Sequence, residues 1–238
     1  MPPTARAAKG PPLSAVLGRA EPLASLVWIF PLFLLYEAGV IFSPVGNGVD
    51  FITRWLWAAS GYHRGTYLLI QATLAAIWVV ALARTARQGM SFKGRFLPIL
   101  LESAIIALLM GTAIVFVMQK IIGFGAATGG PLRSILLSFG AGVHEELVFR
   151  LGLFSGGAAL LRLIGTPHRA AVAIAFVISS IVFSAVHHLG PLGDPWQLDV
   201  FVYRVLAGMI FALIYYHRSL AHAVYTHALY DVYVMVIR

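Results

Sequence analysis

The sequence of 238 residues contains no cysteine and few charged side chains. The absence of cysteine excludes disulfide bonds, a thiol nucleophile, a thiolate metal site and a lipid anchor attached through a cysteine of this protein. Only 11% of the residues are charged, whereas about 25% is usual for a soluble globular domain. The shortage of charge therefore argues against a soluble protein.

Apolar residues are correspondingly abundant. They make up 60% of the chain, and the mean hydropathy is +0.86. Runs of about 20 apolar residues are long enough to cross a bilayer as helices. We therefore expect an all-α fold, a polytopic transmembrane helical bundle of about seven to eight spanning helices. The expected spans are about 24–43, 66–83, 96–119, 131–164, 170–188, 198–216 and 220–237.

Two segments depart from a simple span. Residues 48–63, "GVDFITRWLWAASGYH", carry aromatic side chains of the kind that anchor an interfacial helix. Residues 131–164 are too long for one straight span at 1.5 Å per residue. We expect either one long tilted helix there or two helices broken near Gly156–Gly157.

The basic residues predict the topology. Arg6, Lys9 and Arg19 lie in the N-terminal tail, and the loop 84–95 adds four more basic residues. Because cytoplasmic loops accumulate Lys and Arg, the tail and this loop are expected on the cytoplasmic side. The net charge of +8 is scattered over loops, so a nucleic-acid partner is not expected.

The expected organisation is a cytoplasmic basic tail over 1–22 and a single membrane-embedded domain over 23–238. The lipid bilayer is then the main surrounding of the protein, and the bacterial inner membrane is the expected location. Ionisable side chains inside such a domain are candidates for function. The candidates are Glu37, Glu102, Glu145, Glu146, Arg150, His187, His188, Arg204, His222, His227 and Asp231.

The first cluster of these residues is "HEELVFR", residues 144–150. Glu146 and Arg150 are four residues apart on a helix, so they can form an ion pair that offsets the cost of burying both. Glu145 is rotated by about 100° around the helix and is presented separately. The alternative interpretation is a purely structural ion pair inside a bundle.

Two further clusters follow on later helices. Phe183 and His187 share one helix face, where the ring can help form a dry pocket, although an isolated histidine could equally join two helices. His227 and Asp231 share another face, where the carboxylate can fix the histidine tautomer; a buried capping pair is the alternative. Polar pairs on three separate helices favour one intramembrane site containing a base and two imidazoles.

In this order the motifs E-E-x-x-x-R, F-x-x-x-H and H-x-x-x-N/D resemble those of the CPBP family. This is the CAAX-protease and bacteriocin-processing group of intramembrane endopeptidases, which includes an Abi-like and a myxosortase type. The resemblance covers about residues 95–238, which we regard as the core that bears the motifs. It implies a glutamate-type protease embedded in the membrane.

The resemblance also implies residue roles. Glu145 would be the general base that activates a water molecule, and His187 would position that water. His227 and Asp231 would form the oxyanion side of the site. Related sequences often have Asn at the position of Asp231. Because an ionised Asp cannot donate a hydrogen bond, we expect Asp231 to orient His227, which then donates. The supporting residues are Glu146, Arg150 and Phe183.

Several alternatives remain open. The segment "HEELV" lacks the second histidine of a zinc-binding H-E-x-x-H motif, since position 148 is Val148. We expect no metal and no cofactor, although Glu145, His187 and His227 could in principle bind zinc. The expected substrate is a hydrophobic peptide or the C-terminal anchor or sorting tail of a membrane protein. A non-catalytic membrane scaffold and a haem- or ion-carrying protein are the competing functions.

Overall fold

The computed structural model describes residues 22–42, 49–87, 92–121, 130–190 and 193–237. These residues form helices joined by short connections, and the described part contains no strand. The expected all-α membrane bundle is therefore confirmed. The elements, with η marking π-helical segments, are α2 Pro22–Phe42, α3 Phe51–Ala59, α4 Arg64–Arg87, α5 Phe92–Ile121, α6 Pro131–Glu146, η1 Leu147–Gly156, α7 Gly157–Leu163, α8 His168–Val186, α9 Leu198–His217, α10 Leu220–Val232 and η2 Tyr233–Ile237.

Among the described residues, 5 helices are long and apolar enough to cross a membrane. Seven or eight spans were expected, so this part of the chain provides fewer. The expected final span is helical over 220–237, but only its first 13 residues, α10, are α-helical and the rest is the π-helical η2, so it is not among these helices. The apolar stretches are Ser25–Phe42, Arg64–Arg84, Phe96–Ile114, His168–Val186 and Leu198–His217. The basic tail over 1–22 lies almost wholly outside the described residues.

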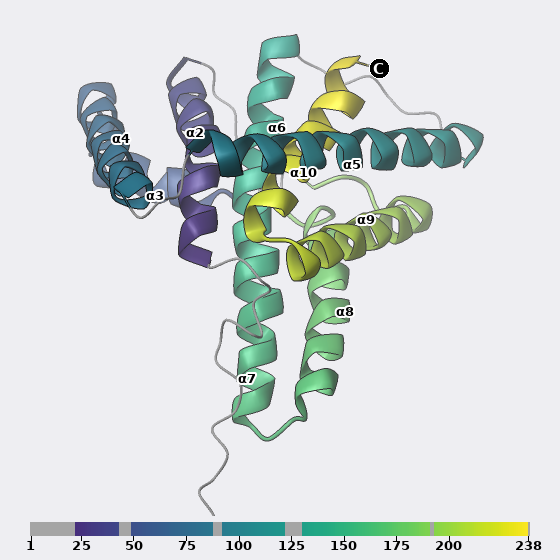
Figure 1. Ribbon diagram of the computed structural model, residues 1–238. Helices are drawn as coiled ribbons and strands as arrows, with labels where there is room; N and C mark the ends of the chain where they lie inside the picture. Colours follow the sequence, from purple (N-terminus) through teal and green to yellow (C-terminus); the bar gives the residue numbers. More distant parts are fainter. Residues whose placement is uncertain (1–21, 43–48, 88–91, 122–129, 191–192, 238) are drawn as a thin grey trace, which may run out of the picture.

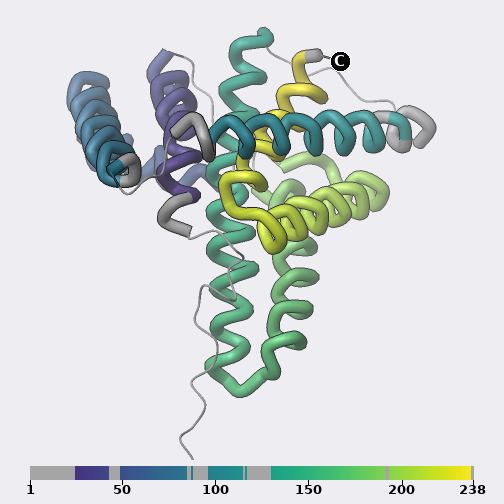
Figure 2. The backbone as a smooth tube through the Cα atoms, viewed as in Figure 1, coloured from purple at the N-terminus to yellow at the C-terminus, as the bar shows by residue number. Residues whose placement is uncertain are grey.

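The segment 131–163 forms one continuous helical rod. Gly156 and Gly157 both have helical backbone angles, with φ of −64° and −62°, so the chain does not break between them. Of the two forms expected for this segment, the single long helix is confirmed. The rod runs through the centre of the molecule, with α2, α3 and α4 on one side and α8 and α9 on the other (Figure 1; Figure 2).

Helix α10 is the element most surrounded by others. It packs mainly against α5 and α6, and also against α9 and α2. The approach to α6 is very close at Gly142, where an added Cβ would lie 2.8 Å from the Cβ of Ala228 and 2.9 Å from its backbone nitrogen. Small residues allow membrane helices to touch along their backbones. This contact brings α10 beside the two glutamates at the end of α6.

Candidate active site

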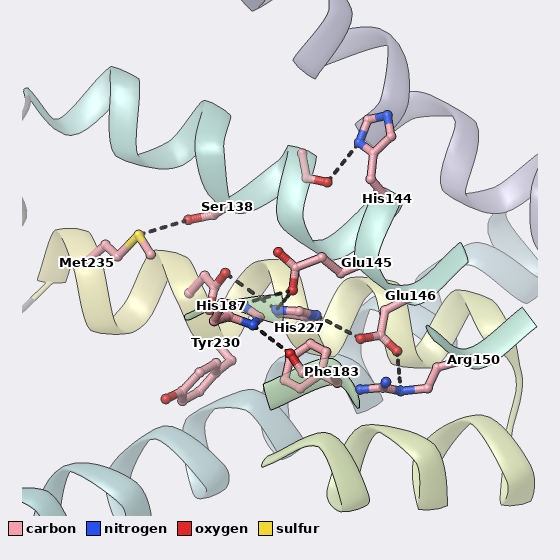
Figure 3. Close-up of polar contacts among 12 residues, drawn as sticks. Ser138, His144, Glu145, Glu146, Arg150, Phe183, His187, His227, Tyr230 and Met235 are labelled. Atoms are coloured by element: carbon pink, nitrogen blue, oxygen red, sulfur yellow. Dashed lines mark hydrogen bonds and ion pairs between the residues drawn. The ribbon is translucent and has the colours of Figure 1, made fainter. Parts of the chain in front are cut away.

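The three polar motifs come together at the centre of the bundle (Figure 3). The Oε2 atom of Glu145 lies 3.5 Å from Nε2 of His187 and 3.8 Å from Nε2 of His227. Glu145 lies in the last turn of α6, His187 caps α8 and His227 lies on α10. The expected convergence of these three side chains is confirmed. A single carboxylate oxygen thus faces one nitrogen of each of two imidazoles.

The end of α8 sets the orientation of His187. Its Nδ1 atom lies 2.7 Å from the backbone carbonyl oxygen of Phe183, one of the acceptors left without a helical partner where a helix ends. A carbonyl oxygen only accepts, so Nδ1 carries the proton and donates. In the neutral ring, Nε2 is then an acceptor, and it is this atom that faces Glu145.

A carboxylate that was not expected there contacts Nδ1 of His227. Its Nδ1 atom lies 2.8 Å from Oε1 of Glu146, while Asp231 lies 3.6 Å from Nε2 on the other side of the ring. The contact of Glu146 with Nδ1 was not expected, and the expected role of Asp231, which lies near Nε2, stays a prediction. The close contact between α6 and α10 is the physical reason for the Glu146 contact, since it places Glu146 within reach of the neighbouring helix. Asp231 instead faces the same nitrogen as Glu145.

Arg150 closes the inner end of the site. Its Nε atom forms the expected ion pair with Oε2 of Glu146 at 3.0 Å, and both side chains are fully buried. Within the described residues its two terminal nitrogens have no hydrogen-bond acceptor. The guanidinium carbon instead lies 4.8 Å from the ring centroid of Phe183 and 5.8 Å from that of Phe211. Such cation–π contacts compensate part of the cost of burying the charge.

Aromatic rings form the wall of the site. Phe211 stacks on His227 with a centroid distance of 4.4 Å and an interplanar angle of 14°. The edge-on ring of Phe183 lies 5.0 Å from His187 and 5.9 Å from His227. Phe183 was expected near His187, but Phe211 was not expected at the site. Nothing in the sequence distinguishes Phe211 from the other aromatic residues of the apolar helices.

The backbone changes directly after the two glutamates. Residues Leu147–Gly156 form a π-helical segment that continues α6 without a break. Wide turns of this kind are uncommon and are often found at functional sites. Here the widened segment carries Arg150 and ends at the glycine pair before α7. The unusual backbone therefore lies where the motif residues must be presented to three other helices.

The side chains of the site differ in their exposure. Glu146 and Arg150 are fully buried, and Glu145 is only 4% exposed, but the side chain of His187 is 26% exposed. His187 is therefore the most exposed of these four side chains. Chemically, a buried carboxylate next to two oriented imidazoles can accept a proton and supply hydrogen bonds to a developing negative charge.

A search of the described residues finds no group of three or more His, Asp or Glu side chains arranged to hold a metal ion. The other ionisable candidates lie elsewhere. Arg204 pairs with Asp194 on the connection between α8 and α9. Glu102 pairs at the surface with Arg218, with 2.5 Å between Oε1 and Nε. Glu37 belongs to a separate buried cluster beside α6.

One known protein family matches the stretch of the chain that contains the site. The model of the family described as type II CAAX prenyl endopeptidase Rce1-like matches residues 127–233. This part of the chain is similar to that family. The resemblance expected from the motifs is thus confirmed. No curated protein and no solved structure matches the chain.

The family and the fold together establish the general class. Rce1-like proteins are CAAX prenyl endopeptidases, and the chain has several helices that can cross a membrane. The protein is therefore an integral membrane peptidase of the CAAX-protease type. The matched stretch contains all seven motif residues named from the sequence, whereas α2, α3, α4 and α5 lie outside it.

Proposed function

We propose that this peptidase is of the glutamate type and cleaves a peptide bond near the membrane with a water molecule activated by Glu145. The observation that carries the proposal is the position of Glu145 Oε2, 3.5 Å from His187 and 3.8 Å from His227. Both separations exceed a normal hydrogen bond. They leave this oxygen facing two imidazole nitrogens across a gap that a bridging water suits.

In this mechanism Glu145 accepts a proton from the water while the oxygen attacks the carbonyl carbon of the substrate. His187, with its proton held on Nδ1 by the carbonyl of Phe183, accepts a hydrogen bond from the same water at Nε2. The proton taken by Glu145 is then delivered to the leaving amine nitrogen. A positioned base of this kind contributes about 10²–10⁴-fold to a rate.

His227 stabilises the oxyanion in this mechanism. Glu146 fixes the ring through Nδ1, so a protonated Nε2 points toward the reacting centre and donates to the carbonyl oxygen. Arg150 keeps Glu146 ionised and in place. Asp231, 3.6 Å from Nε2, stabilises the protonated ring before the substrate arrives.

We propose a hydrophobic peptide or the C-terminal anchor of an exported membrane protein as the substrate, and the bacterial inner membrane, with a cytoplasmic N-terminus, as the location. The apolar surroundings and the partial exposure of His187 support a hydrophobic peptide substrate. The same residues could act with zinc, and a scaffold without activity would keep the fold, so both alternatives must be tested.

The test compares cells that produce the wild-type protein with cells that produce Glu145→Gln at equal levels. Mass spectrometry of C-terminal peptides from the membrane fraction should reveal one or more proteins that are shortened only with the wild type. Purified protein in detergent should then cleave an internally quenched peptide, either prenylated at a CAAX sequence or unprenylated with an apolar C-terminal run. Equal C-terminal profiles together with no cleavage of either peptide would reject a proteolytic function.

A further inference from the structure

A second buried polar cluster lies next to the site, in helices that the family match does not include. Its two carboxylates are Glu37 on α2 and Asp50, the residue that caps the N-terminus of α3. Oxygens of Glu37 accept hydrogen bonds from Thr53 Oγ1 at 2.6 Å, from Gln71 at 3.0 Å and from the hydroxyl of Tyr67. The proposed hydrolysis uses none of these residues.

Asp50 reaches the helix that carries the proposed base. Its Oδ1 atom lies 3.1 Å from Nε2 of His144, the residue immediately before Glu145, and His144 is fully buried. The other ring nitrogen lies 2.9 Å from the backbone oxygen of Gly140 and must donate to it. Both side chains are buried, so removing either one leaves the other without this contact.

Tyr36 adds contacts to Asp50, to His144 and to the same helix. Its hydroxyl donates to Oδ2 of Asp50, and its aromatic ring lies 5.2 Å from the imidazole of His144. The same ring covers Gly140, where an added Cβ would come within 2.3 Å of it. A connected set of contacts therefore joins α2 and the start of α3 to α6. It is made by Tyr36, Asp50, His144 and Gly140 and is here named the Asp50 lock.

The direction of His144 and the direction of Glu145 are linked by the helix. Successive side chains on an α-helix are about 100° apart, and the two residues point away from α6 in different directions (Figure 3). Holding His144 against Asp50 thus fixes the rotation of α6 that turns Glu145 toward His187 and His227. We propose that the Asp50 lock is a positioning device for the base, supplied by the part of the chain outside the family match.

This inference rests on the proposed role of Glu145, and two tyrosines offer a matched test. Tyr36 and Tyr67 are both fully buried and each donates its hydroxyl to a carboxylate of the same cluster. Only Tyr36 belongs to the lock. We would measure kcat and KM for Tyr36→Phe and Tyr67→Phe on whichever of the two quenched peptides the wild type cleaves faster.

Tyr36→Phe should lower kcat by about tenfold to a hundredfold, because a shift of the base by about 1 Å has effects of this size, and should leave KM within about threefold. Tyr67→Phe should leave both constants within about threefold, the scale of a neutral substitution. Asp50→Ala should behave like Tyr36→Phe, and Asp50→Asn, which keeps acceptor and donor groups, should recover most of kcat. Equal losses in Tyr36→Phe and Tyr67→Phe would overturn the proposal, since the cluster would then serve stability alone.

A second measurement does not depend on activity. The chain has no cysteine, so spin labels can be attached at Leu35→Cys on α2 and Leu163→Cys on α7, both exposed in the wild type. The distribution of distances between the labels should broaden or shift in Asp50→Ala and Tyr36→Phe but not in Tyr67→Phe. An unchanged distribution in Asp50→Ala would overturn the proposal even if activity fell. If the wild type cleaved neither peptide and left C-terminal profiles unchanged, a changed distribution in these variants would support the lock while the proposed function was rejected.

Discussion

Two buried polar clusters lie on either side of α6, and they differ in how their carboxylates are surrounded. In the N-terminal cluster, Glu37 and Asp50 accept directed hydrogen bonds from hydroxyl, amide and backbone donors. In the site, the Oε2 atom of Glu145 lies 3.5 and 3.8 Å from two imidazole nitrogens, longer than a usual hydrogen bond. A carboxylate enclosed by donors is suited to holding helices together, whereas one that faces its partners across a gap is suited to receiving a reactant.

The two glutamates of the site also differ in how they are surrounded. Glu146 is held tightly, 2.8 Å from His227 and 3.0 Å from Arg150, in a fully buried position. Its neighbour Glu145 lies toward the partly exposed His187. Adjacent residues of one helix thus divide into a fixed support and a reactive group. The predictions below test this division, from the largest expected effect to the smallest.

The sharpest comparison is Glu145→Gln against Glu37→Gln. Glu145→Gln removes the proposed base and should lower the cleavage rate by about 10²–10⁴-fold, while the protein accumulates normally. Glu37→Gln keeps an acceptor for Thr53, so the rate should stay within about threefold. Initial rates on the quenched peptide, with monodispersity on gel filtration as the control, decide the outcome. Similar losses in both variants would remove the distinction between the clusters.

Two histidines of α10 provide the next comparison. His227→Ala removes the proposed oxyanion donor and should lower kcat by about 10²–10³-fold. His222→Ala is the matched control, because His222 lies on the same helix but faces Glu102 at 3.7 Å rather than the site. Its activity should remain close to that of the wild type. If His222→Ala lost as much activity as His227→Ala, the loss would reflect damage to α10 rather than to the oxyanion site.

The two arginine ion pairs should differ in stability. Arg150→Ala leaves Glu146 buried without its partner, which costs roughly 3–5 kcal/mol in soluble proteins. Arg218→Ala breaks an exposed pair with Glu102, which is typically worth about 0–1 kcal/mol. Thermal unfolding in detergent should show a clear decrease for Arg150→Ala and almost none for Arg218→Ala. Equal midpoints would contradict the supporting role of Arg150.

Substitutions of Asp231 should have smaller effects. Since Glu146 already orients His227, Asp231→Asn should retain substantial activity, because Asn can accept from the ring and donate to an oxyanion. Asp231→Ala should lose more, since the protonated ring then loses one of the two carboxylates near Nε2. The peptide assay compares the two directly. Complete loss in Asp231→Asn would mean that the carboxylate itself takes part, as a proton carrier or a metal ligand.

The smallest expected effect is that of metal removal. Incubation with EDTA followed by gel filtration should leave the rate of peptide cleavage unchanged, because the proposed base acts on water without a metal. Zinc added afterwards should not increase it. A reversible loss of activity that zinc restores would establish the zinc-dependent alternative, with Glu145, His187 and His227 as the first ligands to examine.

Sequence patterns predicted those parts of the site that lie within one helix. The pairing of Glu146 with Arg150 follows from four-residue spacing, as does the approach of Phe183 to His187. The approach of His227 to Asp231 follows in the same way. Hydrophobic runs predicted the helical class for a similarly local reason, since run length alone decides whether a helix can cross a bilayer.

Apart from the meeting of Glu145, His187 and His227, contacts between distant helices were not predicted. Glu146 and His227 are 81 residues apart, and nothing in the period of either helix reveals that they meet. The same holds for Phe211 on His227 and for His144 on Asp50. Among the described residues, fewer helices than the expected seven or eight are long and apolar enough to cross a membrane, because apolar composition does not reveal that a helix such as α10 is enclosed by others.

The contact between Gly142 and Ala228 has a consequence for the tolerance of the sequence to change. Almost any side chain at position 142 would meet the backbone of α10, with 2.9 Å to the nitrogen of Ala228 and 2.9 Å to the oxygen of Val224. In a saturation mutagenesis experiment scored by activity, Gly142 should therefore look like a catalytic position although it has no chemistry to offer. The fold of this enzyme then depends on the absence of a Cβ atom at position 142 as much as on the side chains present elsewhere.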